Sequence, residues 1–265
     1  MRVNRISAWR RVLLALLTTG ALTGIAEAQW LELPVPGTPR TSDGKPNLNA
    51  PAPRTAEGKP NMSGIWRVDT NRYNNNLVPE GSEAPMRPWA AEVYTHRLAT
   101  QGFERPGSRC MPHGTPDAMT VYNFKVLQLP EVMVHLYEEM HTYRQIHTDG
   151  RPLPVDPDPA WYGYSIGRWD GETFVAETAG FRGDDGTWLD NNGHPHTEAL
   201  RLTERFRRIN WGRMEVDVTV DDPKAYSRPW NAQTIRLNQQ PDTELLEHLC
   251  ENNRSFATLQ NIWKK

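Results

Sequence analysis

The chain lacks the sequence signatures of several common enzyme and binding-protein classes. It contains no G-x-S-x-G elbow, phosphate-binding loop, dinucleotide-binding fingerprint, H-E-x-x-H motif or paired C-x-x-C. These absences disfavour ordinary serine-hydrolase, nucleotide-binding and zinc-finger chemistry. After the N-terminal region, no segment approaches the ~20 consecutive apolar residues that a helix needs to cross a bilayer.

The first 28 residues have the features of a secretory signal peptide. The start is basic, Val12 to Ile25 is mostly apolar, and Ala26-Glu27-Ala28 forms a small-x-small cleavage site before Gln29. The pair Arg10-Arg11 leaves both the twin-arginine and the general secretory route open. We predict that residues 1–28 are removed and that the mature chain is exported, either periplasmic or secreted, with no membrane span.

Charge and cysteine content set further limits. Removing the signal peptide takes away four of 30 basic and one of 32 acidic residues, so the formal charge becomes −5 and nucleic acid is not an expected partner. The two cysteines, Cys110 and Cys250, remain. In an oxidising compartment they predict a disulfide, which closes a loop of roughly 140 residues and contributes up to ~5 kcal/mol in the chain-entropy model. Two buried free thiols are the alternative.

Residues 29–62 predict an extended, Pro/Gly-rich arm that contains an internal repeat. The first copy, residues 39–48, reads PRTSDGKPNL, and the second copy, residues 53–62, reads PRTAEGKPNM. Two copies are too few for a solenoid, which needs about three or more repeats. We therefore interpret the arm as a linker or as a strap that lies on the folded domain.

Residues 63–265 predict a single antiparallel β domain. Runs of β-forming residues follow one another with turn signals between them and without βαβ alternation. Asp170-Gly171 and Asn210-Trp211-Gly212 predict hairpins, and residues 88–101 are the one good helix candidate. The predicted fold is a mainly β meander closed into a barrel, or a two-sheet sandwich, with one short helix. The predicted strands are 63–68, 124–129, 132–137, 142–148, 164–169, 173–178, 199–208, 214–220, 233–237 and 245–250.

The segment that begins at Asp190 carries the most informative pattern for function. In an extended chain, alternate side chains share a face. One face, predicted to be interior, holds His194, His196, Glu198, Leu200, Leu202, Glu204 and Phe206. The other face is rich in threonine and arginine, as expected of positions that face water. The first face therefore predicts a ligand cavity with a polar, reactive end.

Three interpretations of the polar end remain open. A His-x-His pair with a carboxylate on one face can bind a metal ion. Alternatively, a histidine tuned by Glu198 or Asp190 can transfer a proton to or from a bound substrate. In the third, the histidines are structural and only satisfy nearby hydrogen-bonding groups. We predict His194, His196, Asp190 and Glu198 as candidate catalytic residues, and we predict no metal and no cofactor.

A second set of side chains is predicted to bind a ligand. Glu204 lies deeper on the same face, and a buried carboxylate needs a partner, for which Arg144, Arg168 and Arg236 are candidates. A nearby predicted hairpin is rich in histidine and tyrosine, and its register decides which of them point inward. The candidate binding residues are Glu204, Tyr143, His147, Trp188 and Arg144.

Several segments carry a resemblance to a known family. They are PRTAEGKPNMSGIW, YRQIHTDGRPLP, YGYSIGRWDGETFVAET, TWLDNNGHPHTEALRLTERFRR, VDDPKAYSRPW and EHLCENN. Over most of residues 53–254 the chain resembles a family of exported bacterial proteins of unknown function, and the first copy of the repeat looks like an addition to that pattern. The resemblance implies export and an all-β domain but no reaction. The stretch SGIW also resembles the Gly-x-Trp start of lipocalin-like (calycin-like) barrels.

Three functions are compatible with these observations. The first is an exported β-barrel that binds a small aromatic or amphipathic molecule in its interior. The second is a cofactor-independent lyase, isomerase or hydrolase that uses His194 and His196 for acid–base chemistry in the same pocket. The third is an envelope protein that docks a partner through its arm.

Overall fold

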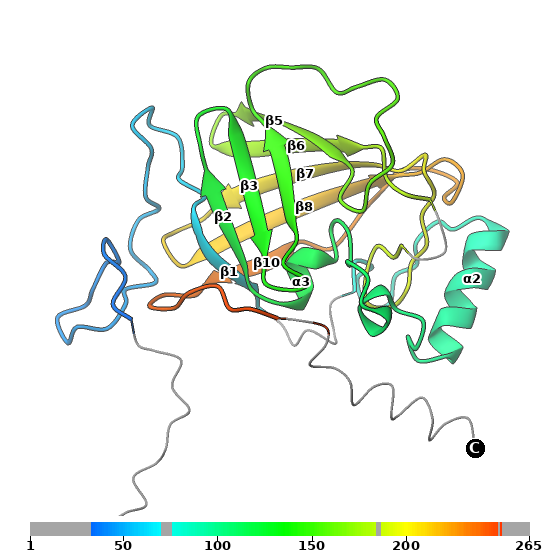
Figure 1. The fold of residues 1–265 in the computed structure, drawn as a ribbon, viewed down its shortest axis with the longest axis horizontal. Coiled ribbons are helices and arrows are strands. Elements are labelled where there is room, and N and C mark those ends of the chain that lie inside the picture. The colour runs from blue at the N-terminus through cyan, green and yellow to red at the C-terminus, as the bar shows by residue number, and fades with distance from the viewer. Residues whose placement is uncertain (1–32, 70–75, 184–186, 249, 251–265) are drawn as a thin grey trace, which may run out of the picture.

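The computed structural model describes residues 33–69, 76–183, 187–248 and 250, so the predicted signal peptide lies outside the described residues. The strands are β1 (Gly64–Val68), β2 (Phe124–Gln128), β3 (Val132–Tyr137), β4 (Tyr143–His147), β5 (Tyr164–Asp170), β6 (Thr173–Ala179), β7 (Arg201–Arg208), β8 (Arg213–Asp221), β9 (Trp230–Asn231) and β10 (Ile235–Gln239). Strands β1 to β8 pair in chain order, and β10 pairs with both β1 and β8. The result is a closed nine-stranded barrel (Figure 1), and β9 pairs with β8 on the same edge as β10 but further along the strand. The predicted mainly β barrel is confirmed.

One pair of neighbouring strands departs from the antiparallel pattern. Strands β4 and β5 are parallel, whereas the other named pairs are antiparallel. Parallel neighbours need a crossover of a dozen or more residues, and residues 148–163 supply it as a long loop (Figure 1). Residue composition alone did not distinguish this crossover from an ordinary hairpin.

The barrel interior is filled by side chains. Along β7 and β8, buried and more exposed positions alternate, as the period of a strand with one face in a core requires. Large apolar residues contributed by the strands are at most 2% exposed: Trp66, Phe124, Met133, Ile146, Phe174, Leu202, Phe206, Met214, Val216, Val218 and Leu237. This packed core fixes the strand ends and the loops that they carry.

The turn predictions agree with the structure at two hairpins and fail near the C-terminus. Asp170 and Gly171 lie in the β5–β6 hairpin, where Gly171 has φ +60°, and the β7–β8 hairpin contains Trp211 and Gly212. The predicted strand at 245–250 is wrong, because residues 245–248 form only a single bridge, at His248. This end of the chain is held by the bridge of His248 to Glu139 in the β3–β4 turn and by the disulfide between Cys250 and Cys110.

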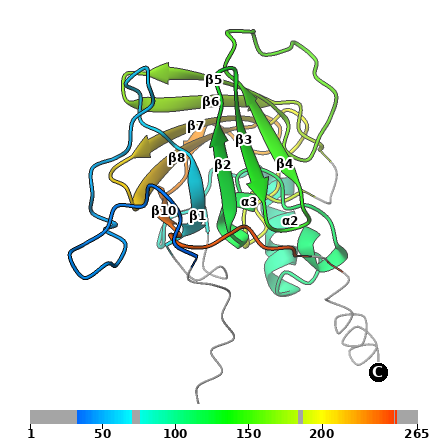
Figure 2. The ribbon, with the colours of Figure 1, turned by 60° about the vertical axis from the view of Figure 1, so that its left-hand side comes forward.

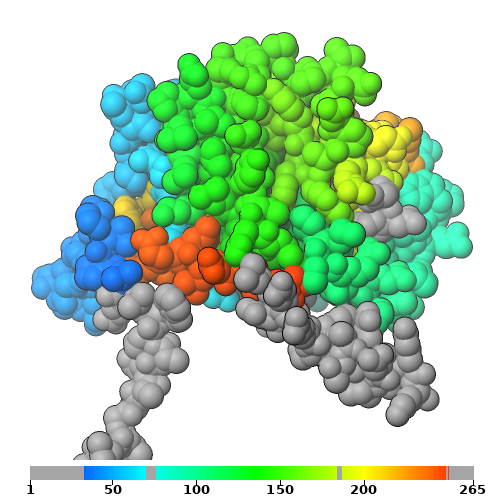
Figure 3. All heavy atoms as spheres, viewed as in Figure 1, coloured from blue at the N-terminus to red at the C-terminus, as the bar shows by residue number. Residues whose placement is uncertain are grey.

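The helical elements lie together at one end of the barrel. They are α2 (Pro88–Ala99), the short 3-10 helix η1 (Pro106–Arg109) and α3 (Ala118–Val121). The predicted helix is confirmed as α2, which begins at Pro88 and ends two residues before the predicted end. Figures 1 and 3 show α2 on one side of the molecule and the arm on the other.

The two copies of the arm repeat fold into the same turn. In each copy the arginine donates a hydrogen bond to the carbonyl of the glycine four residues later, from Arg40 to Gly44 at 3.3 Å and from Arg54 to Gly58 at 2.7 Å. The arm lies along the outside of the barrel (Figure 2). The repeat therefore encodes one local turn twice.

The copies differ in what they contact. In the second copy, Arg54 pairs with Glu172 at 2.8 Å, and Lys59 donates a hydrogen bond to a carbonyl of the β5–β6 turn at 3.0 Å. In the first copy, Arg40 instead forms a two-pronged ion pair with Asp242 after β10, with distances of 2.7 and 2.5 Å. Both copies thus fasten the arm to the barrel, the second at the β5–β6 hairpin and the first at the segment after β10.

Candidate functional site

Two aspartates meet at the end of the barrel that carries α2 and α3. Val68 and Ile235, at the ends of β1 and β10, line a cavity of about 90 Å³. Asp117, just before α3, and Asp190 line the same cavity from the covering loops. Each aspartate holds a histidine four residues away in the sequence. The barrel end therefore brings two His–Asp pairs close together.

Asp190 and His194 form the first pair. His194 Nδ1 lies 2.7 Å from Asp190 Oδ2, and both residues are buried. Asp190 Oδ1 accepts hydrogen bonds from the backbone N–H groups of Asn192, Gly193 and His194 at 3.1 to 3.2 Å. An aspartate that binds the backbone just after itself is typical of a tight turn, and Gly193 supplies the positive φ, +88°, that the turn requires. This turn fixes the position of the His194 imidazole relative to Asp190.

Neighbouring segments hold this loop from two sides. The backbone N–H of Leu77 donates to Asp190 Oδ2 at 2.9 Å. Arg97, on α2, donates to the carbonyl of Gly193 at 3.0 Å, and its guanidinium stacks on Trp188 at 4.7 Å. Trp188, a predicted ligand-binding residue, is buried and supports the loop in this way. The pair is therefore preorganised before any ligand arrives.

The other ring nitrogen of His194 is open. No hydrogen bond to His194 Nε2 is found within the described residues. The ring stacks on Tyr94 of α2 with centroids 4.3 Å apart, and both rings line a cleft of about 470 Å³. Burial and the negative charge of Asp190 raise the pKa of Tyr94, so its hydroxyl is protonated at neutral pH. The remaining lining residues are Asn76, Val78, Ser82, Glu83, Ala84, Met86, Ala91 and Thr95.

The structure does not bring His196 and Glu198 to this cleft. His196 lies edge-on to Phe181 at 5.8 Å, and its Nδ1 is 3.1 Å from the carbonyl of Thr197. Glu198 is exposed and pairs with Lys224. Of the four predicted catalytic residues, only Asp190 and His194 lie together.

The expected strand geometry fails here because the chain turns before β7. The backbone N–H and hydroxyl of Thr197 both donate to Asp222, at 2.6 and 2.9 Å, and a turn at Glu198 and Ala199 follows. The alternation that the sequence predicts begins only at Leu200, which is fully buried. The extended segment is therefore shorter than expected, and His194 reaches its cleft from a loop.

Glu204 lies inside the barrel and is paired. Its carboxylate forms a two-pronged ion pair with Arg144, with one contact at 3.1 Å, and Arg144 also donates to Ser165 and Thr178 at 3.0 and 2.8 Å. Arg144 is thus the partner among the three arginines considered. Burial and the charge of Arg144 lower the pKa of the interior His135 to about 3. This network satisfies the buried charges and is separate from the His194 cleft.

Tyr143 and His147 lie outside the barrel. The register of β4 places Arg144 and Ile146 in the interior, so the intervening positions point outward. Tyr143 is 62% exposed, and His147 stacks on Tyr164 at 5.2 Å. Of the five predicted binding residues, Glu204 and Arg144 pair with each other inside the barrel, and Tyr143, His147 and Trp188 lie elsewhere.

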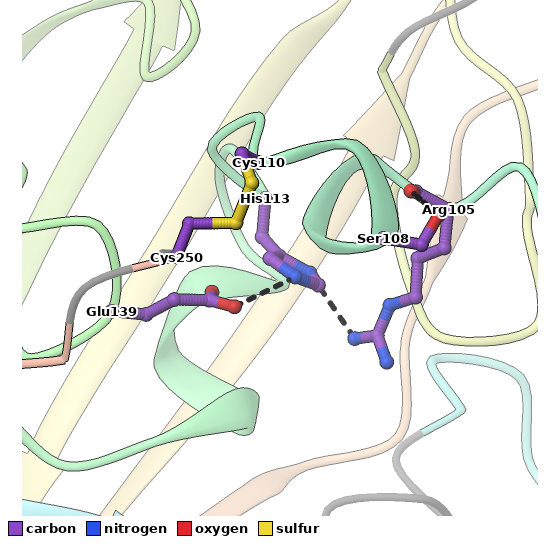
Figure 4. The surroundings of a disulfide bond; sticks show 6 residues. All are labelled: Arg105, Ser108, Cys110, His113, Glu139 and Cys250. Carbon is purple, nitrogen blue, oxygen red and sulfur yellow. Dashed lines mark hydrogen bonds and ion pairs between the residues drawn. A yellow bond between two sulfur atoms is a disulfide. The ribbon is translucent and has the colours of Figure 1, made fainter. Parts of the chain in front are cut away.

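His113 and Asp117 form the second pair, which the sequence analysis missed. His113 Nδ1 lies 2.6 Å from Asp117 Oδ2, and His113 Nε2 lies 3.1 Å from Glu139 Oε1 (Figure 4). Arg105 contacts the same Asp117 oxygen at 3.3 Å. The spacing of four residues was visible in the sequence, but it falls in a Pro/Gly-rich loop, and Glu139 comes from a distant part of the chain.

The charges of this cluster stabilise one another. Although burial opposes it, Arg105 and His113 lower the pKa of Asp117 to about 2. Burial also opposes protonation of His113, yet Asp117 and Glu139 raise its pKa. The imidazole therefore lies between two carboxylates that favour its protonated form, while Arg105, 3.1 Å from Nδ1, opposes it.

The predicted disulfide lies beside this cluster. Cys110 and Cys250 are bonded to each other, which confirms the prediction (Figure 4). The bond joins the loop that carries His113 to the C-terminal segment. A disulfide is compatible with an exported protein.

The described residues contain neither a group of three or more His, Cys, Asp or Glu side chains suited to a metal ion nor a helix long and apolar enough to span a membrane. No protein-family model, curated protein or solved structure matches the chain. The fold and site therefore define a nine-stranded barrel with a buried His–Asp pair on an open cleft, and function has to be derived from that geometry.

Proposed function

We propose that this chain is an exported, cofactor-independent enzyme in which Asp190 and His194 act as a general base on a small molecule in the cleft beside α2. One observation carries the proposal: a carboxylate holds the imidazole at Nδ1, Nε2 has no hydrogen-bond partner among the described residues, and the ring, although only 2% exposed, lines a cleft of about 470 Å³. A positioned base needs this combination of a fixed tautomer and access to the reacting proton.

The geometry supports a simple division of roles. With its Nδ1–H donated to Asp190, His194 presents the lone pair of Nε2 to the cleft and accepts a proton there. Asp190 then stabilises the resulting imidazolium. The protonated hydroxyl of Tyr94, on the same cleft, is placed to stabilise negative charge that develops on the substrate. Hydrolases, lyases and isomerases share this first proton transfer.

Ligand binding without catalysis is less well supported as a separate function. The binding hypothesis placed the ligand in the barrel interior, and the strand side chains fill that interior. The His194 cleft lies outside it, between α2 and residues 76–86. Binding in this cleft is the first step of the proposed reaction.

A docking role of the arm is the second candidate. Its support is that the apolar side chains of Leu33, Val35 and Leu48 on the arm are 37 to 42% exposed. Single exposed apolar residues are common on soluble proteins and need no partner. The arm therefore ranks below the cleft.

The proposal is tested with a panel of small chromogenic esters and lactones. Wild-type protein should hydrolyse at least one of them, and His194→Gln should lower that turnover by about 10²- to 10⁴-fold, the usual contribution of a general base. His96→Gln, which changes an exposed histidine on α2, is the matched control and should retain full turnover. Equal turnover in wild type and His194→Gln would exclude His194 as the base.

A further inference from the structure

The charge around the His194 cleft is one-sided. Apart from His194, the only charged side chain among its described lining residues is Glu83, and no lysine or arginine lines it. Glu83 makes no hydrogen bond or ion pair within the described part of the chain. Its carboxylate is therefore available to a ligand.

A second negative charge lies behind the cleft. Asp190 is 2.7 Å from the imidazole of His194, and its charge contributes to the raised pKa of Tyr94 on the cleft wall. The negative field thus reaches the space where a ligand would lie. The apolar wall consists of Val78, Ala84, Met86 and Ala91. Together these features favour an apolar body with a positive group.

A neighbouring cleft has a different balance of charge. This second cleft, of about 400 Å³, shares Val78, Ser82 and Glu83 with the His194 cleft and adds Arg228 and Trp230. Glu83 therefore lies between the two clefts, and the basic residue lines only the second. An anionic ligand would find its counter-charge, Arg228, in the second cleft, which His194 does not line.

We infer that the His194 cleft binds a small cationic amphipath, with its ammonium or similar positive group against Glu83, and discriminates against carboxylates and phosphates. The inference rests on the proposed function, because it names the substrate class of the same site. Glu83 is then a specificity-determining residue and His194 is the catalytic one. Because Glu83 is exposed to solvent, we expect a discrimination of about two- to fivefold, the range of an exposed ion pair.

Three probes with one apolar body and different charges test the inference. Benzylamine, benzyl alcohol and benzoate are titrated into ¹⁵N-labelled wild-type protein, and the amide resonances of Ala91, Tyr94 and His194 are followed. Benzylamine should bind about two- to fivefold more tightly than benzyl alcohol, and benzoate should bind most weakly. Glu83→Gln should abolish the preference for benzylamine, and added salt should reduce it.

Glu80→Gln is the matched control, because Glu80 is exposed on the same segment but lines neither cleft. This variant should keep the preference. Equal binding of the three probes, tighter binding of benzoate, or an unchanged preference in Glu83→Gln would overturn the charge selection and leave the proposed base intact. If no probe shifts the cleft resonances, both the charge selection and the proposed function fail.

Discussion

The two His–Asp pairs at the end of the barrel differ in what the second ring nitrogen of the histidine contacts. Their Nδ1–Oδ2 distances are 2.7 Å for His194 and 2.6 Å for His113, and all four side chains are buried. His113 Nε2 contacts Glu139, whereas His194 Nε2 is open to the cleft. The comparison indicates that the contact of the second ring nitrogen decides the role of a buried His–Asp pair. The pair is structural where this nitrogen contacts a carboxylate, and it can act as a base where this nitrogen has no partner.

The carboxylates of the two pairs also depend on their histidines to different degrees. Asp190 accepts four backbone N–H groups besides its histidine, from residues 77, 192, 193 and 194. Asp117 depends on the side chains of His113, Arg105 and Thr120. Losing the histidine therefore leaves Asp190 bound by the backbone, whereas at the His113 cluster Glu139 loses its ion-pair partner and Asp117 keeps only Arg105 and Thr120.

The largest expected effect is on stability. His113→Ala should lower the free energy of unfolding by about 3 to 5 kcal/mol, because Glu139 loses its ion-pair partner and Asp117 keeps only Arg105. His194→Ala should cost about 1 to 2 kcal/mol, as for the loss of one hydrogen bond. Urea denaturation at neutral pH measures both. Equal losses for the two variants would show that the second nitrogen does not distinguish the pairs.

The next effect concerns activity. Asp190→Asn should lower turnover of the best ester in the panel by about 10²-fold or more, because an amide no longer fixes the tautomer that presents Nε2 to the cleft. Its unfolding free energy should fall far less than that of Asp117→Asn. Full turnover in Asp190→Asn would mean that the carboxylate does not orient the base.

A smaller effect is expected in acid. The pKa of Asp117 falls from 3.8 to about 2 on folding, so its stabilisation is complete above the unfolded value and is lost as pH falls toward about 2. The loss amounts to about 2 kcal/mol. Urea denaturation between these pH values measures it, and the same titration of Asp117→Asn should lack this component. An identical acid dependence in the variant would contradict the assignment.

The smallest effect is expected at alkaline pH. Since folding raises the pKa of His113, the stabilisation from its imidazolium is complete below the unfolded value, and it is lost as pH rises through the folded value. Thermal unfolding across neutral and mildly alkaline pH measures the loss. His113→Gln should remove this pH-dependent loss of stability, and His96→Gln should retain it. Retention in His113→Gln and loss in His96→Gln would assign the pH dependence to the surface histidine His96.

The sequence predicted those features whose causes are local. The hairpin at Gly171 follows from short-range turn chemistry, and the alternation from Leu200 onward follows from strand period. The Cys110–Cys250 bond spans 140 residues and was predictable because the chain has only two cysteines. The pairing of Glu204 was predictable because a buried carboxylate needs a partner. Its partner, Arg144, was one of three possibilities until the register of β4 was known.

The rest of the site depends on contacts between distant segments. Thr197 turns the chain away from the expected strand by binding Asp222, and this separates His196 from His194. Similarly, the role of His113 depends on Glu139, which folding brings from the end of β3. Neither contact has a periodic signal in the sequence. The sequence therefore could not show that the second nitrogen of His113 is bonded and that of His194 is not.

Chemical modification of the histidines tests the central claim most directly. Diethyl pyrocarbonate reacts with an unbonded imidazole nitrogen, and peptide mass spectrometry follows each histidine separately over time. Our account predicts that folded protein is modified at His194 well before His113, that a cleft ligand slows only His194, and that His113 reacts once the protein is unfolded. Equal protection of both histidines in the folded protein would contradict the open Nε2 on which the proposed function rests.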